Sequence, residues 1–336
     1  NFVTFEADYA ARGFDDVRAM AVTELLQATM EAEEKVILGG NSSVLLGTGA
    51  TPTGVAVATG GGLSDGTTYS IIVVPLTYDG MLQSSVAAGV KLPYTRTNAD
   101  GTTDTIQGFS GIQSAASAAV TLAAGTAVQA ITATTTAVRG AFGYAWYLNS
   151  SAASQRLVAI TGQPVALLTA LNASGQLASA LPASDTSTNS LVFDGLLTQI
   201  VKSGSGGYYV DLANAALTTS GSGTGGITEI DTAISAFYDT YRLIPTTIIM
   251  NGTDQKNAKN KILTGNTNLA PFFMGAASDT GLAAATQFKT YNNPIGFGNQ
   301  SLDVIAHPFM PQGTLMFYST KVPYVLSNVT DIVRMN

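Results

Sequence analysis

The residues best suited to chemistry are three glutamates, Glu31, Glu33 and Glu34, in a stretch rich in helix-forming residues. A helix places Glu31 and Glu34 on one face, where paired carboxylates could act as general acid and base. No histidine and no second group of carboxylates lies close to them in the sequence. We therefore favour a solvated face, or a face that contacts another subunit, over a catalytic site.

Other candidate sites are weaker still. The single histidine, His307, lies in a strand-like run, and one histidine cannot by itself build a metal site or a catalytic triad. Glycine tracts at residues 203–207 and 218–226 lack the Lys-Ser/Thr pair of a phosphate-binding loop, so we interpret them as linkers or surface loops. The chain has no cysteine, which excludes disulfides and thiolate metal sites. The sequence thus predicts no catalytic residue, cofactor or metal.

Composition narrows the class of protein. The 336 residues carry a net charge of −7, and only 11% of them are charged, against about a quarter in typical chains. A surface of Ser, Thr, Ala and Gly suits repeated contact between identical neighbours, although a secreted β-rich protein has a similar composition. A nucleic-acid-binding face needs concentrated basic residues, which this chain lacks. No apolar run reaches the eighteen or so residues that span a membrane.

The longest predicted element is an amphipathic helix over residues 15–38, roughly 36 Å long at 1.5 Å per residue. Its apolar positions recur at spacings of three and four: Val17, Ala21, Leu25, Ala28, Ala32 and Val36. Its polar positions lie opposite: Asp16, Thr23, Gln27, Glu31 and Glu34. We expect Asp15 as the N-cap, a stop at residues 39–41, and packing of the stripe across other elements. Residues 1–13 predict an extended arm.

Residues 48–190 predict a β-sandwich, because short strand-like runs alternate with turn signals such as residues 64–66, 78–80 and 98–101. The expected strands are residues 54–59, 67–77, 90–97, 102–109, 128–138, 141–148 and 156–161. The only tryptophan, Trp146, is interpreted as a core anchor and not as a ligand-stacking platform. We interpret residues 163–190 as a link out of the sandwich.

The remaining chain predicts an α/β unit. A short apolar segment over residues 191–200 precedes a helix that includes Ile227 and Tyr241 and ends before Pro245. A buried strand over residues 246–250 follows, and then a helix capped by Thr253. Asn251-Gly252-Thr253 fits a glycosylation sequon, but a strand end followed by a helix cap explains it equally well. Further strands are expected at residues 294–298, 301–308, 313–320 and 322–327.

This order of elements resembles the major capsid proteins of tailed bacteriophages, whose Johnson fold is shared with herpesvirus capsids and encapsulins. The stretches that carry the resemblance are residues 30–41, 191–200, 227–263 and 293–320. Within the sandwich, residues 65–80 and 137–151 resemble immunoglobulin-like and fibronectin type III-like modules.

The resemblance implies an α+β Johnson fold with a long spine helix, peripheral and axial domains, and an inserted all-β immunoglobulin-like sandwich. Residues 1–14 would be a partial N-terminal arm or the remnant of the family's extended loop. Residues 15–47 would form the peripheral spine helix, and residues 48–190 the inserted sandwich with its link. Residues 191–320 would form the axial domain with peripheral returns, and residues 321–336 a C-terminal peripheral strand.

The function implied by the resemblance is structural and not enzymatic. Copies of the chain would form hexamers and pentamers of an icosahedral virion capsid, assembled in the host cytoplasm around double-stranded DNA that is enclosed without sequence-specific contacts. Other partners would be a portal and decoration proteins, with no membrane. Because both ends of the insertion attach near Gly47 and Ser190, we expect the sandwich on the outer surface. The candidate subunit-interface residues are Glu31, Glu34, Lys35, Asp194 and Phe5.

Two alternatives remain open. An encapsulin-like compartment would share the fold but enclose a cargo enzyme. A secreted β-rich adhesin or carbohydrate-binding protein would explain the low charge and the Ser/Thr/Gly content, but not the long helix or the α/β unit.

Overall fold

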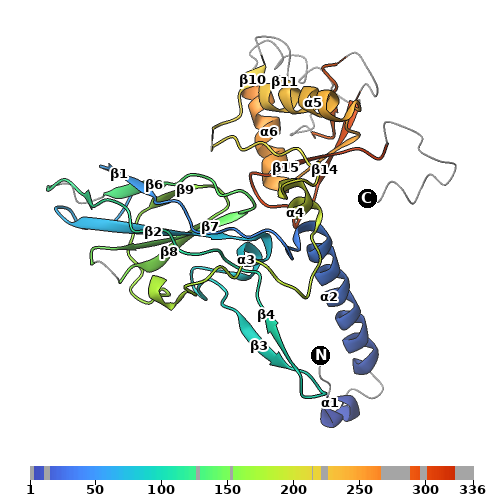
Figure 1. The fold of residues 1–336 in the computed structure, drawn as a ribbon, viewed down its shortest axis with the longest axis horizontal. Coiled ribbons are helices and arrows are strands. Elements are labelled where there is room, and N and C mark those ends of the chain that lie inside the picture. Colours follow the sequence, from blue (N-terminus) through green and yellow to red (C-terminus); the bar gives the residue numbers. More distant parts are fainter. Residues whose placement is uncertain are drawn as a thin grey trace. The chain divides into compact units, whose positions relative to one another are not determined.

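The computed structural model describes residues 4–10, 16–125, 129–151, 154–213, 215–220, 226–265, 288–295 and 301–321. The chain is α+β, and its contacts divide it into two compact units (Figure 1). Unit 1 ends at Gly207 and unit 2 begins at Tyr208, except that Thr161–Val165 groups with unit 2. Residues 191–207, which we expected in the axial domain, therefore group with the long helix and the sandwich.

Unit 1 begins with helices α1 (Phe5–Ala10) and α2 (Val17–Gly39). The expectation of an extended arm is wrong for the residues of α1. The N-cap of α2 is Asp16 and not Asp15, because the Asp16 carboxylate accepts hydrogen bonds from the backbone N–H groups of Arg18 and Ala19. At the other end, the Gly40 N–H donates to the Val36 carbonyl over 2.8 Å. The stop at Gly39 and Gly40 is confirmed.

The predicted β-sandwich is confirmed as two sheets that share one core. The three-stranded sheet has the order β1 (Thr53–Val57), β6 (Ala130–Thr134) and β9 (Val165–Leu168). The four-stranded sheet has the order β5 (Val120–Thr121), β2 (Thr68–Leu76), β7 (Gly143–Asn149) and β8 (Arg156–Thr161). Trp146 has no exposed surface and lies in this core, as expected. β9 lies within the segment that we expected to be a link, so that expectation is wrong there.

The four-stranded sheet is buried on both faces. Its second face packs in a separate cluster that includes Leu76, Tyr147 and Leu157. Apolar residues therefore follow one another in β2 and β7 without the alternation of a half-exposed strand. Helix α3 (Tyr78–Gln83) follows β2 in the chain, and the short 3₁₀ helix η1 (Ala178–Ala180) follows β9. The turn expected at residues 78–80 is instead the start of α3, capped by the Thr77 hydroxyl, which accepts from the Gly80 N–H.

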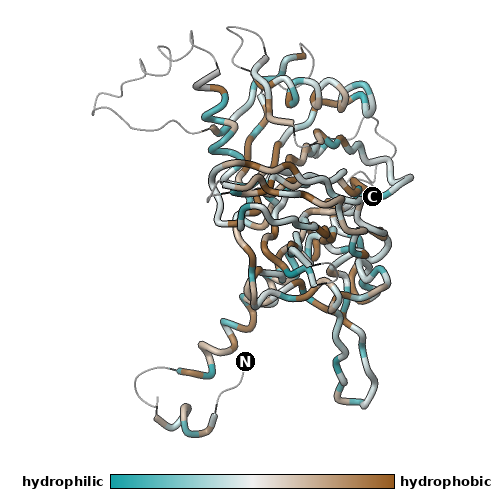
Figure 2. The backbone as a smooth tube through the Cα atoms, turned by 90° about the vertical axis from the view of Figure 1, so that its left-hand side faces the viewer, coloured by the Kyte–Doolittle hydropathy of each residue, from teal (hydrophilic) through white to brown (hydrophobic). Residues whose placement is uncertain are grey.

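Strands β3 (Tyr94–Thr97) and β4 (Thr103–Ile106) form a hairpin of their own and join neither sheet. The expectation that they belong to the sandwich is therefore wrong. Tyr94 pairs with Ile106, and Gly101 in the turn has a φ of 84°, which glycine adopts readily. Figures 1 and 2 show the hairpin projecting from the sandwich and separated from α2.

An irregular segment with two serines closes one edge of β2. The Ser117 and Ser114 hydroxyls accept hydrogen bonds from the N–H groups of Ile71 and Val73, each over 3.0 Å. The next residue on that side of the strand is Pro75, which has no N–H to satisfy. Serine hydroxyls therefore accept hydrogen bonds from backbone N–H groups that would otherwise pair with a neighbouring strand.

Ser114→Ala is expected to lower the free energy of unfolding by about 1–3 kcal/mol, because it leaves the buried Val73 N–H unsatisfied. Urea unfolding followed by circular dichroism measures this change. The matched control is Ser64→Ala at an exposed position, where we expect a change within about 0.5 kcal/mol. Equal losses for the two variants would contradict the assigned role of the Ser114 hydroxyl.

Unit 2 contains the expected helix–strand–helix order as α5 (Thr228–Tyr241), β12 (Thr247–Met250) and α6 (Gly252–Gly265). β12 pairs in parallel with β14 and antiparallel with β15. The four-stranded sheet has the order β13 (Thr290–Asn292), β14 (Ser301–Ala306), β12 and β15 (Leu315–Tyr318). A short ladder of β10 (Thr219–Ser220) and β11 (Gly226–Ile227) precedes α5. The core joins both helices to this sheet through residues such as Ile230, Ala258 and Leu302.

Some boundaries in unit 2 differ from expectation. α5 ends before Arg242, whose left-handed backbone (φ 58°) closes the helix upstream of Pro245. Thr253 was expected as the N-cap of the second helix, but α6 begins at Gly252, and the Asn251 side chain just before it accepts a hydrogen bond from the Thr253 N–H. The strand expected at residues 322–327 lies outside the described residues, as does most of the one at residues 294–298.

Candidate subunit interface

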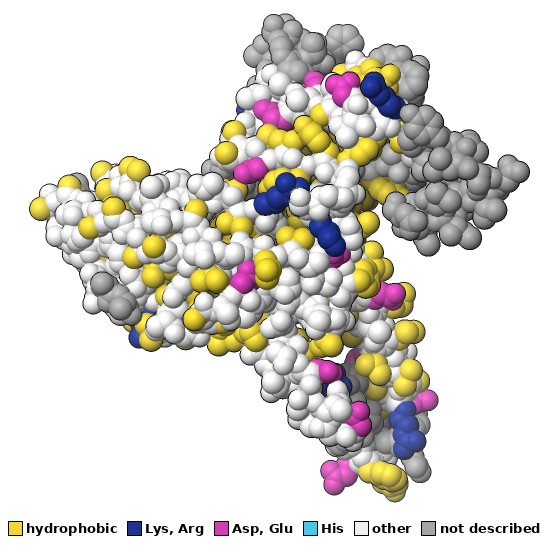
Figure 3. Space-filling model, viewed as in Figure 1, with side chains coloured by type: hydrophobic (Ala, Val, Ile, Leu, Met, Phe, Trp, Pro, Cys, Tyr) yellow, Lys and Arg dark blue, Asp and Glu magenta, His cyan; other side chains and the backbone are white. Residues whose placement is uncertain are grey.

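Most apolar residues of α2 are exposed to solvent. Within the helix only Leu38 and Gly39, at its last turn, are buried. The expectation that the predicted stripe packs across other elements of the chain is therefore wrong, since Leu25, Ala28 and Ala32 are all exposed. The exposed large residues of α2, with their exposed fractions, are Met20 53%, Val22 65%, Leu25 52%, Leu26 59%, Met30 61% and Ile37 43%. Figure 3 shows hydrophobic side chains along the visible face of α2.

Glu24, Glu31 and Glu34 lie in a polar strip beside this apolar surface, whereas Glu33 lies on the same side of the helix as Val22 and Leu26. Glu31 is half-buried, accepts a hydrogen bond from the Gln27 amide over 3.4 Å, and lies 4.0 Å from the Lys35 ammonium. An exposed pair of this kind contributes at most a few tenths of a kcal/mol to helix stability. The expected interface residues Glu31, Glu34 and Lys35 thus lie together, on the last turns of α2. Phe5, another expected interface residue, lies on α1, and 84% of its surface is exposed.

The last turns of α2 also approach α3. Burial, and then the nearby charges of Asp79 and Glu34, raise the pKa of the Tyr78 phenol. Burial likewise raises the pKa of Asp79, although a hydrogen bond from Gln83 and the charge of Lys35 act in the opposite direction. Glu34 and Lys35 of α2 therefore lie close enough to α3 to affect the pKa of Tyr78 and of Asp79.

At its C-terminal end α2 is fixed to the start of helix α4 (Leu196–Val201) by close backbone packing. The Gly195 N–H donates to the Gly40 carbonyl over 2.8 Å. A Cβ atom on Gly195 would lie 2.7 Å from the Val36 oxygen and 2.8 Å from the nitrogens of Gly39 and Gly40. Only glycine allows the two segments to approach this closely.

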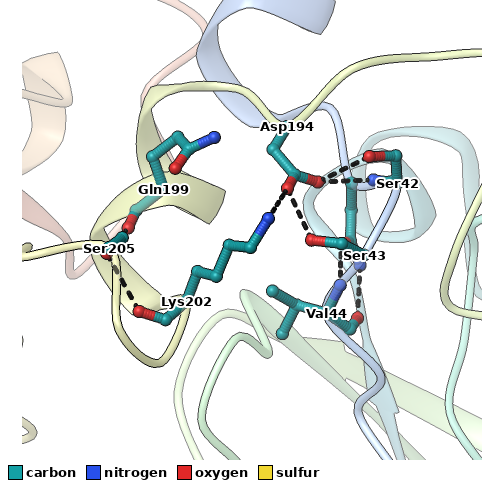
Figure 4. A network of polar contacts seen from close by, with 8 residues as sticks. Ser42, Ser43, Val44, Asp194, Gln199, Lys202 and Ser205 are labelled. Atoms are coloured by element: carbon teal, nitrogen blue, oxygen red, sulfur yellow. Dashed lines mark hydrogen bonds and ion pairs between the residues drawn. The ribbon is translucent and has the colours of Figure 1, made fainter. Parts of the chain in front are cut away.

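Asp194 lies at the centre of a polar network at this junction (Figure 4). Its carboxylate accepts hydrogen bonds from the Ser42 N–H and hydroxyl, over 2.8 and 2.9 Å, and from the Ser43 hydroxyl over 2.5 Å. The Lys202 ammonium lies 2.7 Å away, and the Asp194 side chain is only 6% exposed. Asp194 is therefore engaged within unit 1, and its expected role in a contact between subunits stays a prediction.

The network sets the ionisation of Asp194. Burial alone would raise the pKa of this carboxyl, but the hydrogen bonds from Lys202, Ser43 and Ser42 outweigh it and hold the pKa well below its ordinary value. A carboxyl whose pKa is lower in the folded than in the unfolded chain stabilises the fold above its unfolded pKa of about 3.9. That contribution is lost as the pH falls below this value.

Asp194→Asn is therefore expected to reduce stability near neutral pH and to weaken its dependence on pH. At pH 7 we expect a loss of about 1–3 kcal/mol, because charge-assisted hydrogen bonds are removed. The difference from the unaltered chain should shrink below about pH 4, where the carboxyl begins to protonate. Urea unfolding at a series of pH values measures both effects. A difference that stays constant from pH 7 to about pH 2 would contradict the lowered pKa.

The two ends of the sandwich lie side by side beside this junction. The Asn41 amide donates to the Ser187 carbonyl over 2.8 Å, and the Asn189 N–H donates to the Asn41 carbonyl over 2.8 Å. The Leu46 N–H donates to the Ser187 hydroxyl over 3.0 Å. Arg139, from the loop before β7, donates to the Val201 carbonyl at the end of α4. The chain thus leaves the end of α2, forms the sandwich, and returns to the place where it left.

Sequence reasoning missed the most conspicuous part of this candidate site. The predicted stripe did not include Val22, Leu26 and Met30. Their presence in the sequence indicates only that the apolar surface is wider than a core-facing helix requires. Ser42, Ser43 and Lys202 had no motif that would indicate their contacts with Asp194. None of the helices in the described part of the chain is long and apolar enough to cross a membrane. Within those same residues, no group of three or more acidic or histidine side chains could hold a metal.

Comparisons with known protein families, with curated proteins and with solved structures gave no match to this chain.

Proposed function

We propose that this chain is a self-assembling shell subunit of the kind found in tailed-bacteriophage capsids, with α2 as its spine helix and the sandwich as an immunoglobulin-like insertion into a Johnson fold. In this proposal copies form hexamers and pentamers that close an icosahedral shell around double-stranded DNA. The partners are further copies, a portal and decoration proteins. The shell is assembled in the host cytoplasm and becomes the virion capsid.

The observation that carries the proposal is the exposed apolar surface of α2. Its six large exposed side chains, from Met20 to Ile37, lie on more than one side of the helix and together present on the order of 600 Å² of surface, as much as the largest single patch of a typical monomer. A stable interface covers about 800 Å² on each partner. An isolated chain would leave this surface in water, whereas an assembly buries it.

The attachment of the sandwich supports the second part of the proposal. Its entry at residues 41–47 and its exit at residues 185–189 are hydrogen-bonded to each other, as expected for a domain inserted at one point of a host fold. Such a domain projects from its attachment point without interrupting the elements on either side. In a filled shell the outer surface offers room for it, because the interior is occupied by the genome.

Electron microscopy and analytical ultracentrifugation of the purified full chain test the proposal. We expect capsomers or closed shells at high protein concentration, with many modest contacts repeated by symmetry. A chain that stays monomeric under every condition of salt, pH and concentration would overturn the proposal. Nuclease-protected DNA in the particles supports a capsid, whereas a co-purifying enzyme supports an encapsulin-like compartment. A monodisperse monomer that binds a glycan array would support an adhesin instead.

A further inference from the structure

The apolar surface of α2 is too wide for one partner. At about 100° per residue, the apolar positions among residues 19–32 run from Ala28 round to Met30 over an arc of roughly 200°, interrupted only by Thr29. The strip with Glu24, Gln27 and Glu31, which also includes Met20, takes up the rest, and Glu33 enters the arc only in the next turn. A helix that faces a single core needs an apolar stripe of only about 100°. The arc on α2 is about twice as wide as one neighbouring element can cover.

Two separate rows of residues make up this arc. Row A contains Ala21, Leu25, Ala28 and Ala32, at spacings of four, three and four. Row B contains Ala19, Val22, Leu26 and Met30, at spacings of three, four and four. Both spacings keep a row on one side of a helix, and the two rows are rotated from each other by roughly 130°. A flat surface or a single helix that contacts one row would leave the other in water.

Resting on the proposed function, we infer that α2 is held between two further copies of this chain, one against row A and one against row B. Row B exposes more than half of each of Val22, Leu26 and Met30, and row A exposes 52% of Leu25. With about 800 Å² per partner in a stable interface, each row supplies part of one contact, and neighbouring surfaces supply the rest.

A lipid surface is a poorer occupant. It would cover α2 from one side only, and an anionic membrane would repel a helix whose cap and body carry five carboxylates against Arg18 and Lys35. Identical copies, in contrast, can approach from two sides because symmetry repeats each contact around the assembly.

Single-cysteine variants test the inference, since the chain has no cysteine of its own. Ala28→Cys places a thiol in row A, Ala19→Cys in row B, and Gln27→Cys in the polar strip as the control. Maleimide labelling rates are measured in assembled particles and in dissociated chains of each variant. We expect both Ala28→Cys and Ala19→Cys to react at least about ten times more slowly in particles, with little change for Gln27→Cys, because thiol reactions depend on access.

The remaining outcomes separate this inference from the proposed function. Particles in which only one row is protected, or neither, overturn the two-sided contact while self-assembly stands. Protection already present in the dissociated chain means that the chain covers its own helix, which also overturns the inference. Protection that appears only with vesicles of phosphatidylglycerol and phosphatidylcholine favours a membrane occupant. A chain that never assembles overturns the proposed function and this inference together.

Discussion

Replacing Leu26 and Met30 together with glutamate is expected to abolish self-association while the chain stays folded. Both side chains are about 60% exposed, so their loss leaves the core of the single chain intact. Glutamate also has a high helix propensity, so α2 should persist. At an interface, however, each carboxylate would be buried without a partner, at a cost of several kcal/mol that symmetry repeats in every copy. Sedimentation and electron microscopy measure assembly, and circular dichroism measures folding.

The matched control places the same two charges on the polar strip of the same helix. Thr23→Glu with Gln27→Glu changes the net charge by the same amount, but the new carboxylates should remain in water, because contacts on rows A and B leave the strip with Glu31 as a solvated face and not as an interface. We expect this variant to assemble nearly as the unaltered chain does. Normal shells from the Leu26→Glu, Met30→Glu variant would show that this part of α2 is not an interface. Equal failure of both variants would indicate a general effect of negative charge.

Trp146→Ala is expected to lower the free energy of unfolding of unit 1 by about 3–5 kcal/mol. The indole has no exposed surface and lies in the core between the two sheets, where it packs among residues such as Tyr69 and Leu168. Neither sheet can close over the cavity, because β7 is held in register with β2 along its whole length. Calorimetry or far-ultraviolet circular dichroism measures the change, since the variant has no tryptophan fluorescence.

Trp146→Phe is the control for this prediction, because it keeps an aromatic side chain and leaves a smaller cavity. We expect its loss to be clearly below that of Trp146→Ala. A loss of less than about 1 kcal/mol for Trp146→Ala would contradict the assignment of Trp146 as the anchor of the sandwich.

The sequence predicted elements well where burial and periodicity agree. Trp146, the apolar runs of β2 and β7, and the isoleucines of α5 all lie where the pattern indicated, because each contacts a core of its own unit. Residues 94–106 also read as strands, but periodicity cannot tell a strand of a large sheet from one of an isolated hairpin. Which strands pair depends on contacts between residues far apart in the chain.

The candidate site was harder to predict. An apolar stripe on α2 has the same pattern whether its partner lies in the same chain or in another, so Leu25 was expected in a core and is exposed. Asp194 was predicted as a subunit-interface candidate, but no local pattern indicates its contacts with Ser42 and Ser43, about 150 positions earlier in the chain. Such side-chain contacts depend on the tertiary structure, and the glycines that allow them, such as Gly195, look like turn residues in the sequence.

The closed edge of β2 has a consequence for crowding. Along residues 71–75 the N–H groups on that side are taken by Ser117 and Ser114 or are absent at Pro75. An edge with open donors would invite a strand from a neighbouring molecule, and the hazard grows with local concentration. A surface that carries many copies of this sandwich only nanometres apart would otherwise favour fusion of their sheets. The two serines and the proline close this stretch of β2 to pairing with a strand from a neighbouring copy.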